Sequence, residues 1–203
     1  MKFNKLKKIA VLTCIFAMLG TAVFAATLSD IGGHWAETNI ITLVDAGVIN
    51  GYPDGTFRPN GTISKAEFLK LLISASVPSW YDILGTYEGI KLEHWAVPYL
   101  NLANTYSVVD YGELTTEDLD KPATRKEMAL WTAKADISMA SHDFSKESVV
   151  SFSDCGELSN EEISWLNHTV ARGLITGYPD NTFGPEKNMT RAEAATVIYR
   201  YTR

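Results

Sequence analysis

The stretch GYPDGTFRPNGTISKAE, residues 51–67, recurs as GYPDNTFGPEKNMTRAE, residues 177–193. The two segments have equal length and are identical at nine of 17 positions. Upstream, LVDAGVIN at 43–50 has the same pattern as TVARGLIT at 169–176, with Gly47 and Gly173 in register. Self-similarity of this kind indicates a repeat protein, in which each copy is one supersecondary unit.

A middle copy is visible through its spacing. The tripeptide HWA at 34–36 returns at 94–96, 60 residues later, and the same offset places Lys65 on Arg125 and Glu67 on Glu127. The GYPD turn is lost in this copy, and YGELTTEDLDKP at 111–122 stands in its place. We therefore predict three copies, at 26–76, 86–137 and 150–203, with 138–149 as a polar, mobile linker before the third.

Each copy has the pattern helix, loop, helix. In copy one the first helix is predicted at 35–46, with Gly47 as its C-terminal stop, and the second begins after Ser64. The apolar positions at helical spacing are Ala36, Ile40, Leu43 and Val44, then Phe68, Leu71 and Leu72, with Met128 and Trp131 in copy two and Val197, Ile198 and Tyr201 in copy three. Because a pair of short helices cannot bury its apolar face alone, we predict a mainly α fold in which the copies pack together.

A basic residue opens the second helix of every copy. The motifs are ISKAE at 63–67, ATRKE at 123–127 and MTRAE at 189–193. The flanking serine or threonine and glutamate predict a capping box, which places Lys65, Arg125 and Arg191 at the first helical position. A cation is slightly unfavourable there because of the helix dipole.

A bound anion would remove that conflict. A helix N-terminus presents unpaired backbone N–H groups to an anion, and an arginine can hold a carboxylate through two hydrogen bonds. The alternative is a solvated surface cation that tolerates a small penalty. The repetition of the pattern in three copies favours an anion-binding role.

The N-terminus predicts export. Lys2, Lys5, Lys7 and Lys8 precede an apolar run at 9–24 and a small-residue cleavage site, so residues 1–25 are predicted to be a signal peptide. An uncleaved membrane anchor is the alternative, but the apolar run is short for a span. Cleavage removes four lysines and no acidic residue, so the mature chain is more acidic than the net charge of −6 of the whole chain. Such a chain is not expected to bind nucleic acid or, after cleavage, a membrane, and an anionic ligand needs a specific site.

The sequence contains no recognisable catalytic pattern. The four histidines lack metal-ligand spacing, and there is no nucleophile elbow or Gly-rich phosphate loop. The mature chain has one cysteine, Cys155, and hence no internal disulfide framework. We expect no catalysis, no cofactor and no metal, and the role of Cys155 stays open.

The order of motifs in copy one, LSDIGGHWAE, then AGVINGYPDGTFRPN, then ISKAEF, resembles the S-layer homology (SLH) domain. The resemblance implies a pseudo-threefold, three-pronged unit around a central three-helix bundle. It also implies an exported protein of the cell surface that binds a secondary cell-wall polysaccharide non-covalently. The epitope is expected to be a pyruvylated N-acetylmannosamine, bound by the motif cations Lys65, Arg125 and Arg191. Other surface-layer proteins are further expected partners, and a protein-interaction module that has lost sugar binding is the alternative.

Aromatic and acidic residues complete the expected site. Trp35 and Trp95 are candidate platforms for a sugar ring, although a tryptophan that opens an amphipathic helix can also belong to the core. Asp30 and Asp154 are candidates either to cap the loop or to accept sugar hydroxyls.

Two glycines and an arginine are further candidates. Gly51 and Gly177 either allow close approach of the ligand to the backbone or satisfy the turn geometry. Arg58 is a candidate in copy one, but Gly184 stands at its position in copy three.

Copies two and three depart from the family pattern. Copy two has Ile90 where copy one has Asp30 and lacks the turn, and copy three has Glu161 where Trp35 would fall. Since the family binds its ligand in grooves between copies, we expect fewer than three working sites. The ranking expected from sequence is that Lys65→Ala and Arg191→Ala weaken wall binding more than Arg125→Ala.

Overall fold

The computed structural model describes residues 28–77, 91–140, 142–144 and 151–203, and in these ranges the chain is helical with isolated β-bridges in place of strands. The predicted mainly α fold is confirmed. The helices are α1 (Glu37–Asp45), α2 (Lys65–Ser76), α4 (Val97–Thr105), α5 (Arg125–Ser138), α6 (Asn160–Ala171) and α7 (Arg191–Tyr201). None of these is long and apolar enough to cross a membrane. The predicted signal peptide lies outside the described residues.

The second helix of each copy begins where the capping motif places it. The side chains of Ser64, Thr124 and Thr190 accept the backbone N–H three residues on, and the glutamate at that position accepts the N–H of the cap. This reciprocal bonding satisfies two donors that a helix otherwise leaves open. The cations therefore stand at the first position of α2, α5 and α7, as predicted.

The first helix of copy one begins later than predicted, at Glu37. Trp35 and Ala36 lie in a turn, and the ring of His34 accepts the backbone N–H of Ala36 through Nδ1 at 3.2 Å. His94 does the same for Ala96 in copy two. A histidine side chain thus stabilises the turn that leads into each helix.

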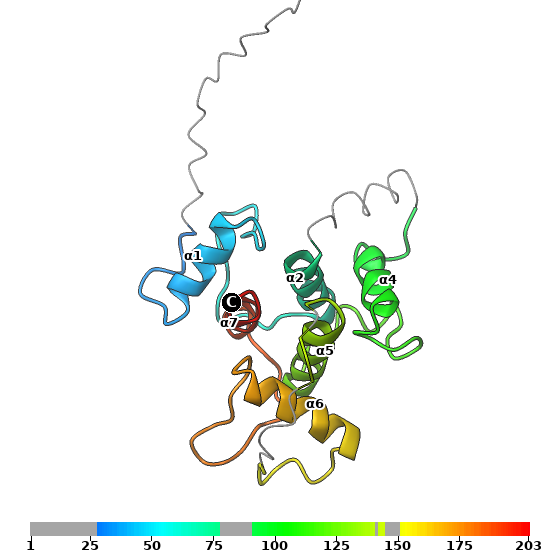
Figure 1. The fold of residues 1–203 in the computed structure, drawn as a ribbon. Helices are drawn as coiled ribbons and strands as arrows, with labels where there is room; N and C mark the ends of the chain where they lie inside the picture. Colours follow the sequence, from blue (N-terminus) through cyan, green and yellow to red (C-terminus); the bar gives the residue numbers. More distant parts are fainter. Residues whose placement is uncertain (1–27, 78–90, 141, 145–150) are drawn as a thin grey trace, which may run out of the picture.

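The three copies are interleaved. Helices α2, α5 and α7 lie together at the centre, each in contact with the other two, and α1, α4 and α6 lie around them (Figure 1). Each outer helix packs on the central helix of another copy: α1 on α7, α4 on α2, and α6 on α5. A copy on its own would therefore expose the apolar faces that its neighbours now cover.

A ring of backbone hydrogen bonds lies directly before the central helices. The N–H of Ile63 donates to the carbonyl of Met189, that of Met189 to Ala123, and that of Ala123 to Ile63, each at 3.0 Å. The three bonds close on themselves because each copy donates to one neighbour and accepts from the other. This pattern is consistent with the predicted threefold arrangement.

Most predicted apolar positions are buried. Phe68 and Trp131 are fully covered and stack with their ring centroids 6.3 Å apart, and Val197, Ile198 and Tyr201 are buried in α7. Leu71 is an exception, since it is only half-buried and lines a groove on the surface. The apolar face of α2 is therefore wider than the core alone requires.

The predicted linker at 138–149 is described only in part. Ser138 is the last residue of α5. His142 Nδ1 lies 2.8 Å from Asp136 Oδ1, and the Phe144 ring packs 5.3 Å from those of Trp165 and His168. These residues are packed on α5 and α6, so this part of the segment does not behave as a free linker.

Asp136 is fully buried at that junction. Burial acts to raise its pKa, but hydrogen bonds from Arg172, His142 and His168 outweigh burial and hold the pKa below its ordinary value. The carboxylate stays charged and ties α5 to α6.

Candidate ligand-binding grooves

The backbone N–H groups at the helix starts are not open to an anion, contrary to our expectation. Lys65 N–H donates to the carbonyl of Lys121, and Ala66 N–H donates to that of Leu119, at 3.0 and 2.9 Å. The same two positions of α5 and α7 donate to carbonyls in the loops of copies three and one. An anionic ligand must therefore be bound by side chains.

A first groove, here named the Arg191 groove, has a volume of about 380 Å³ and lies where all three copies meet. Copy one supplies the turn and α2, copy two supplies Trp95, and copy three supplies Arg191. The groove is lined by Val48, Ile49, Asn50, Gly51, Tyr52, Glu67, Lys70, Leu71, Trp95 and Arg191. It brings together members of three predicted classes: a motif cation, a turn glycine and a tryptophan.

Arg191 is held firmly in this groove. Its Nη1 donates to Glu67 Oε1 at 2.9 Å, and its Nε donates to the carbonyl of Phe57 at 2.8 Å. The guanidinium lies 4.6 and 4.7 Å from the ring centroids of Tyr52 and Phe57. Tyr52 also donates to Glu67 at 3.1 Å, so the arginine, the tyrosine and the glutamate form one network.

A second groove, here named the Arg125 groove, has the same plan with the copies exchanged. Its volume is about 180 Å³; copy three supplies the turn, copy one supplies Trp35 and copy two supplies Arg125. It is lined by Trp35, Arg125, Ile175, Thr176, Gly177, Tyr178, Met189, Glu193, Thr196, Val197 and Arg200. The cation of the degenerate middle copy thus serves a groove whose other parts are intact.

Among the described residues, Arg125 has no acidic partner. Its Nη2 donates to the carbonyl of Thr176, its Nη1 lies 3.5 Å from Met189 Sδ, and its buried Nε has no hydrogen-bond partner among the described residues. Burial lowers its pKa, although an arginine stays charged at physiological pH. The guanidinium lies 4.8 Å from the ring of Tyr178 and 4.9 Å from that of Phe183, as Arg191 lies against Tyr52 and Phe57.

The third groove, here named the acidic groove, has a volume of about 360 Å³, and most of its charged lining residues are carboxylates. Its lining residues are Asp110, Glu113, Lys126, Glu127, Leu130, Trp131, Lys134, Ser159, Glu161, Glu162 and Trp165. Glu113 comes from the segment that replaced the turn of copy two, Asp110 directly precedes that segment, and Glu161 stands where a tryptophan is expected. Both departures noted in the sequence therefore meet in one groove.

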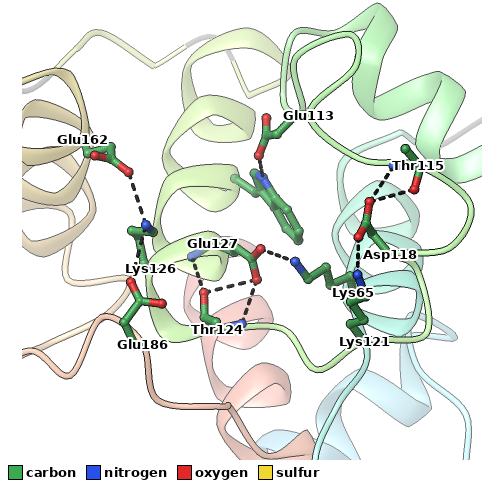
Figure 2. A network of polar contacts seen from close by, with 11 residues as sticks. Lys65, Glu113, Thr115, Asp118, Lys121, Thr124, Lys126, Glu127, Glu162 and Glu186 are labelled. Carbon is green, nitrogen blue, oxygen red and sulfur yellow. Dashed lines mark hydrogen bonds and ion pairs between the residues drawn. The ribbon is translucent and has the colours of Figure 1, made fainter. Parts of the chain in front are cut away.

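The motif cation beside the acidic groove is already neutralised. Figure 2 shows Lys65 directed at Glu127, with which it forms a largely buried ion pair. Lys126 lies 3.4 Å from both Glu162 and Glu186, and Glu113 accepts a hydrogen bond from the indole of Trp131. An acidic ligand would meet five carboxylates here and only two lysines, Lys126 and Lys134.

The capping glutamates explain why the three cations differ. In copies one and two, one carboxylate oxygen caps the helix and the other binds the cation of a neighbouring copy. In copy three, Glu193 caps α7 through Oε2, but it forms no ion pair with Arg125. Two of the three motif cations are thus paired with a capping glutamate, and Arg125 is not.

Asp30 and Asp154 act as loop caps. Asp30 accepts the N–H groups of Phe57 and Arg58, both at 2.7 Å, and Asp154 accepts those of Phe183 and Gly184, both at 2.8 Å. The two backbone donors hold the pKa of Asp154 below its ordinary value. Neither aspartate lines a groove, so of the two predicted roles the structure supports the loop cap. Beside Asp154, burial raises the pKa of the Cys155 thiol to about 11.

Each turn glycine makes room for an apolar side chain that belongs to the same copy. A Cβ on Gly51 would lie 2.3 Å from Leu28 Cδ2, and one on Gly177 would lie 2.1 Å from Phe152 Cε1. Neither glycine has a positive φ, so backbone freedom is not what requires them. Both glycines line the grooves, and their immediate physical role is internal packing.

The two tryptophans lie at the surface. Trp35 is 64% exposed and Trp95 is 49% exposed, so neither belongs to the core. Each packs beside the histidine that precedes it, at 5.4 and 5.5 Å between ring centroids. An exposed indole held in place at the edge of a groove is suited to contact a sugar ring.

Arg58 lies outside all three linings. It is exposed, pairs with Asp54 at 2.8 Å and places its guanidinium 4.0 Å from the centroid of the Tyr52 ring. Its φ of 59° is in the left-handed region, where the glycine of copy three is the easier residue. Ile90, the counterpart of Asp30, lies outside the described residues.

Sequence reasoning missed the ring pairs Tyr52 with Phe57 and Tyr178 with Phe183, which enclose the cations. The available signal was their identity in the two GYPD segments. Within the described ranges, no group of three or more histidine, cysteine, aspartate or glutamate side chains is placed to hold a metal ion.

The family comparison agrees with this geometry. The family model of the S-layer homology domain matches residues 27–69 and 162–195, which include the turns and cations of copies one and three. The chain carries S-layer homology domains. The model matches the two copies with intact turns, and the middle copy stays a prediction from the spacing of its motifs.

The relatives include proteins named as S-layer proteins, a cellulosome-anchoring protein and an amylopullulanase. An S-layer protein of Bacillus licheniformis is 38% identical over 97% of this chain and 23% of its own length. A cellulosome-anchoring protein of Acetivibrio thermocellus is 31% identical over 75% of this chain and 34% of its own length. An amylopullulanase of Thermoanaerobacterium thermosulfurigenes is 26% identical over 91% of this chain and 10% of its own length. The SLH unit thus spans between a tenth and about a third of these relatives.

Proposed function

We propose that this chain anchors an exported protein to the bacterial cell wall by binding an acidic secondary cell-wall polysaccharide in two grooves, without forming a covalent bond. The observation that carries the proposal is the convergence, in both grooves, of a motif cation, an exposed tryptophan and a glycine turn from three different copies. The names of the S-layer and cellulosome-anchoring relatives support a place at the cell surface.

The chemistry of the grooves fits a pyruvylated amino sugar. The indole offers an apolar surface to the sugar ring, and the basic side chains offer charge to the ketal carboxylate. The rest of the SLH unit is acidic and would repel an anionic polymer elsewhere on its surface. Specific binding at two points is therefore needed, and two points on one rigid unit also raise the avidity for a polymer with several epitopes.

The experiment is sedimentation of the mature chain with purified cell walls, before and after chemical removal of the secondary polysaccharide. We expect binding to intact walls only. Binding that survives removal of the polysaccharide would overturn the sugar as ligand and indicate a protein partner on the wall. A variant with both Arg125→Gln and Arg191→Gln, checked for folding by circular dichroism, should bind intact walls more weakly than the unmodified chain.

A further inference from the structure

Lys70 is the cation of the Arg191 groove that has no partner. It lies on α2, three residues after Glu67 and thus on the same face of the helix, and it lines the groove. It is half-buried, and no hydrogen bond or ion pair engages it within the described part of the chain. A lysine in this setting buries its stem and presents a free ammonium group.

Arg191, by contrast, is already matched. The carboxylate of Glu67 lies 2.9 Å from it, and the Phe57 carbonyl binds a further nitrogen. An acidic ligand that approached Arg191 would also approach Glu67, so the attraction of one charge is offset by the repulsion of the other. Lys70 adds a charge that nothing in the groove compensates.

The Arg125 groove reaches the same charge balance differently. The position equivalent to Lys70 is Thr196, which is neutral, but Arg125 itself is free of any carboxylate partner. Each groove therefore contains at least one cation without a carboxylate partner among the described residues: Lys70 in the Arg191 groove, and Arg125 and Arg200 in the Arg125 groove.

We propose that Lys70 binds the acidic group of the ligand in the Arg191 groove, where Arg191 serves to position Glu67 and Tyr52. This inference rests on the proposed function, because it assigns the residue that recognises the carboxylate of the pyruvylated sugar. It places the carboxylate further along α2 than the motif cation would. A lysine contributes a single hydrated point charge, so binding in this groove should depend more steeply on salt than binding through Arg125.

The two tryptophans allow each groove to be measured separately. In ¹⁵N-labelled mature chain, the indole N–H signal of Trp95 reports on the Arg191 groove and that of Trp35 on the Arg125 groove, with assignment by Trp95→Phe. The titrant is the methyl glycoside of pyruvylated N-acetylmannosamine, and the same glycoside without the pyruvyl group is its control. Variants are Lys70→Gln, Lys70→Arg and the control Lys121→Gln, which removes an exposed lysine outside both grooves.

We expect Lys70→Gln to weaken the titration of the Trp95 signal about tenfold, as for the loss of one charged hydrogen bond, and to leave Trp35 unchanged. Lys70→Arg should restore binding to within about threefold, and Lys121→Gln should have no effect. An unchanged Trp95 titration in Lys70→Gln, or equal changes at both tryptophans, would overturn the assignment of Lys70 alone. Absence of any response to the pyruvylated sugar in the unmodified chain would overturn the proposed ligand together with this inference.

Discussion

The Arg191 groove and the acidic groove occupy equivalent places between copies, yet they carry opposite charge. The Arg191 groove is lined by Arg191 and Lys70 against a single carboxylate, Glu67. The acidic groove is lined by five carboxylates against two lysines. Neither groove belongs to one copy, because turn, tryptophan and cation come from three. A change in the turn of copy two therefore damages the groove served by Lys65 of copy one, and it spares Arg125 of copy two.

The largest expected effect is the difference in wall binding between the variants Arg125→Gln and Lys65→Gln. Arg125→Gln should weaken binding to intact walls by at least about thirtyfold, because loss of a partly desolvated charged contact costs about 2–5 kcal/mol. Lys65→Gln should change wall binding little, because Lys65 is paired with Glu127 beside a groove that repels acidic ligands. Wall sedimentation over a range of protein concentrations measures both. This ranking reverses the one expected from sequence.

The free energy of unfolding serves as the control for the variants Arg125→Gln and Lys65→Gln. Lys65→Gln leaves Glu127 without its partner and should lower the free energy of unfolding by about 1–3 kcal/mol. Equal losses of wall binding in the two variants, with both folded by circular dichroism, would contradict the charge difference between the grooves.

The next-largest effect is expected from a substitution in the intact turn of copy three, compared with the equivalent position of copy two. Gly177→Ala places a methyl group 2.1 Å from the Phe152 ring and should lower the free energy of unfolding by about 1–3 kcal/mol. Tyr111 stands at the equivalent position of copy two and is 80% exposed. Tyr111→Ala should therefore change the free energy of unfolding by less than about 0.5 kcal/mol. Urea denaturation followed by tryptophan fluorescence measures the difference. Similar values for the two variants would show that the intact turn is not tightly packed.

Acidification should weaken all the loops, in spite of their different sequences. Hydrogen bonds from Thr56 and Arg58 lower the pKa of Asp54 to about 2, those from Phe183 and Gly184 lower that of Asp154, and those from Lys121 and Thr115 lower that of Asp118. A lowered pKa in the folded state means that the unfolded chain takes up protons first, so this stability is present above about pH 4 and is lost below it.

The melting temperature should therefore be nearly constant from about pH 7 to 5 and should fall between about pH 4 and 2. Calorimetric scans measure the fall, and Asp154→Asn should make it shallower by removing one of the titrating groups. A melting temperature that rises on acidification would contradict the assignment.

The smallest effect concerns the capping glutamates of the two basic grooves. Glu67→Gln keeps the helix cap, because glutamine also serves at that position, and it releases Arg191 from its ion pair. Binding of the pyruvylated sugar in the Arg191 groove should become about threefold tighter, as for a partly exposed ion pair. The matched change Glu193→Gln should have a smaller effect, because Glu193 does not pair with Arg125.

The local features of this chain could be predicted, and the pairing of its parts could not. The capping boxes at Ser64, Thr124 and Thr190 follow from residue spacing, and so do the helix starts and the mainly α fold. The composition of each groove depends on which copies become neighbours, and contacts such as that between Ile63 and Met189 decide this across more than half of the chain. The role of His34 as a cap was missed for a similar reason, since it depends on the geometry of one turn.

The packing of α1 on α7 also has a consequence for the order of folding. The first described helix of the chain rests on the last, so the face that α1 must bury does not exist until α7 has formed. When such a chain is delivered N-terminus first through a membrane, its early segments cannot close into the final ring on the near side. Contacts between distant segments slow folding, and here they would delay its completion until the last copy has been released. The interleaved unit is thus suited to cross a membrane unfolded and to close only at its destination.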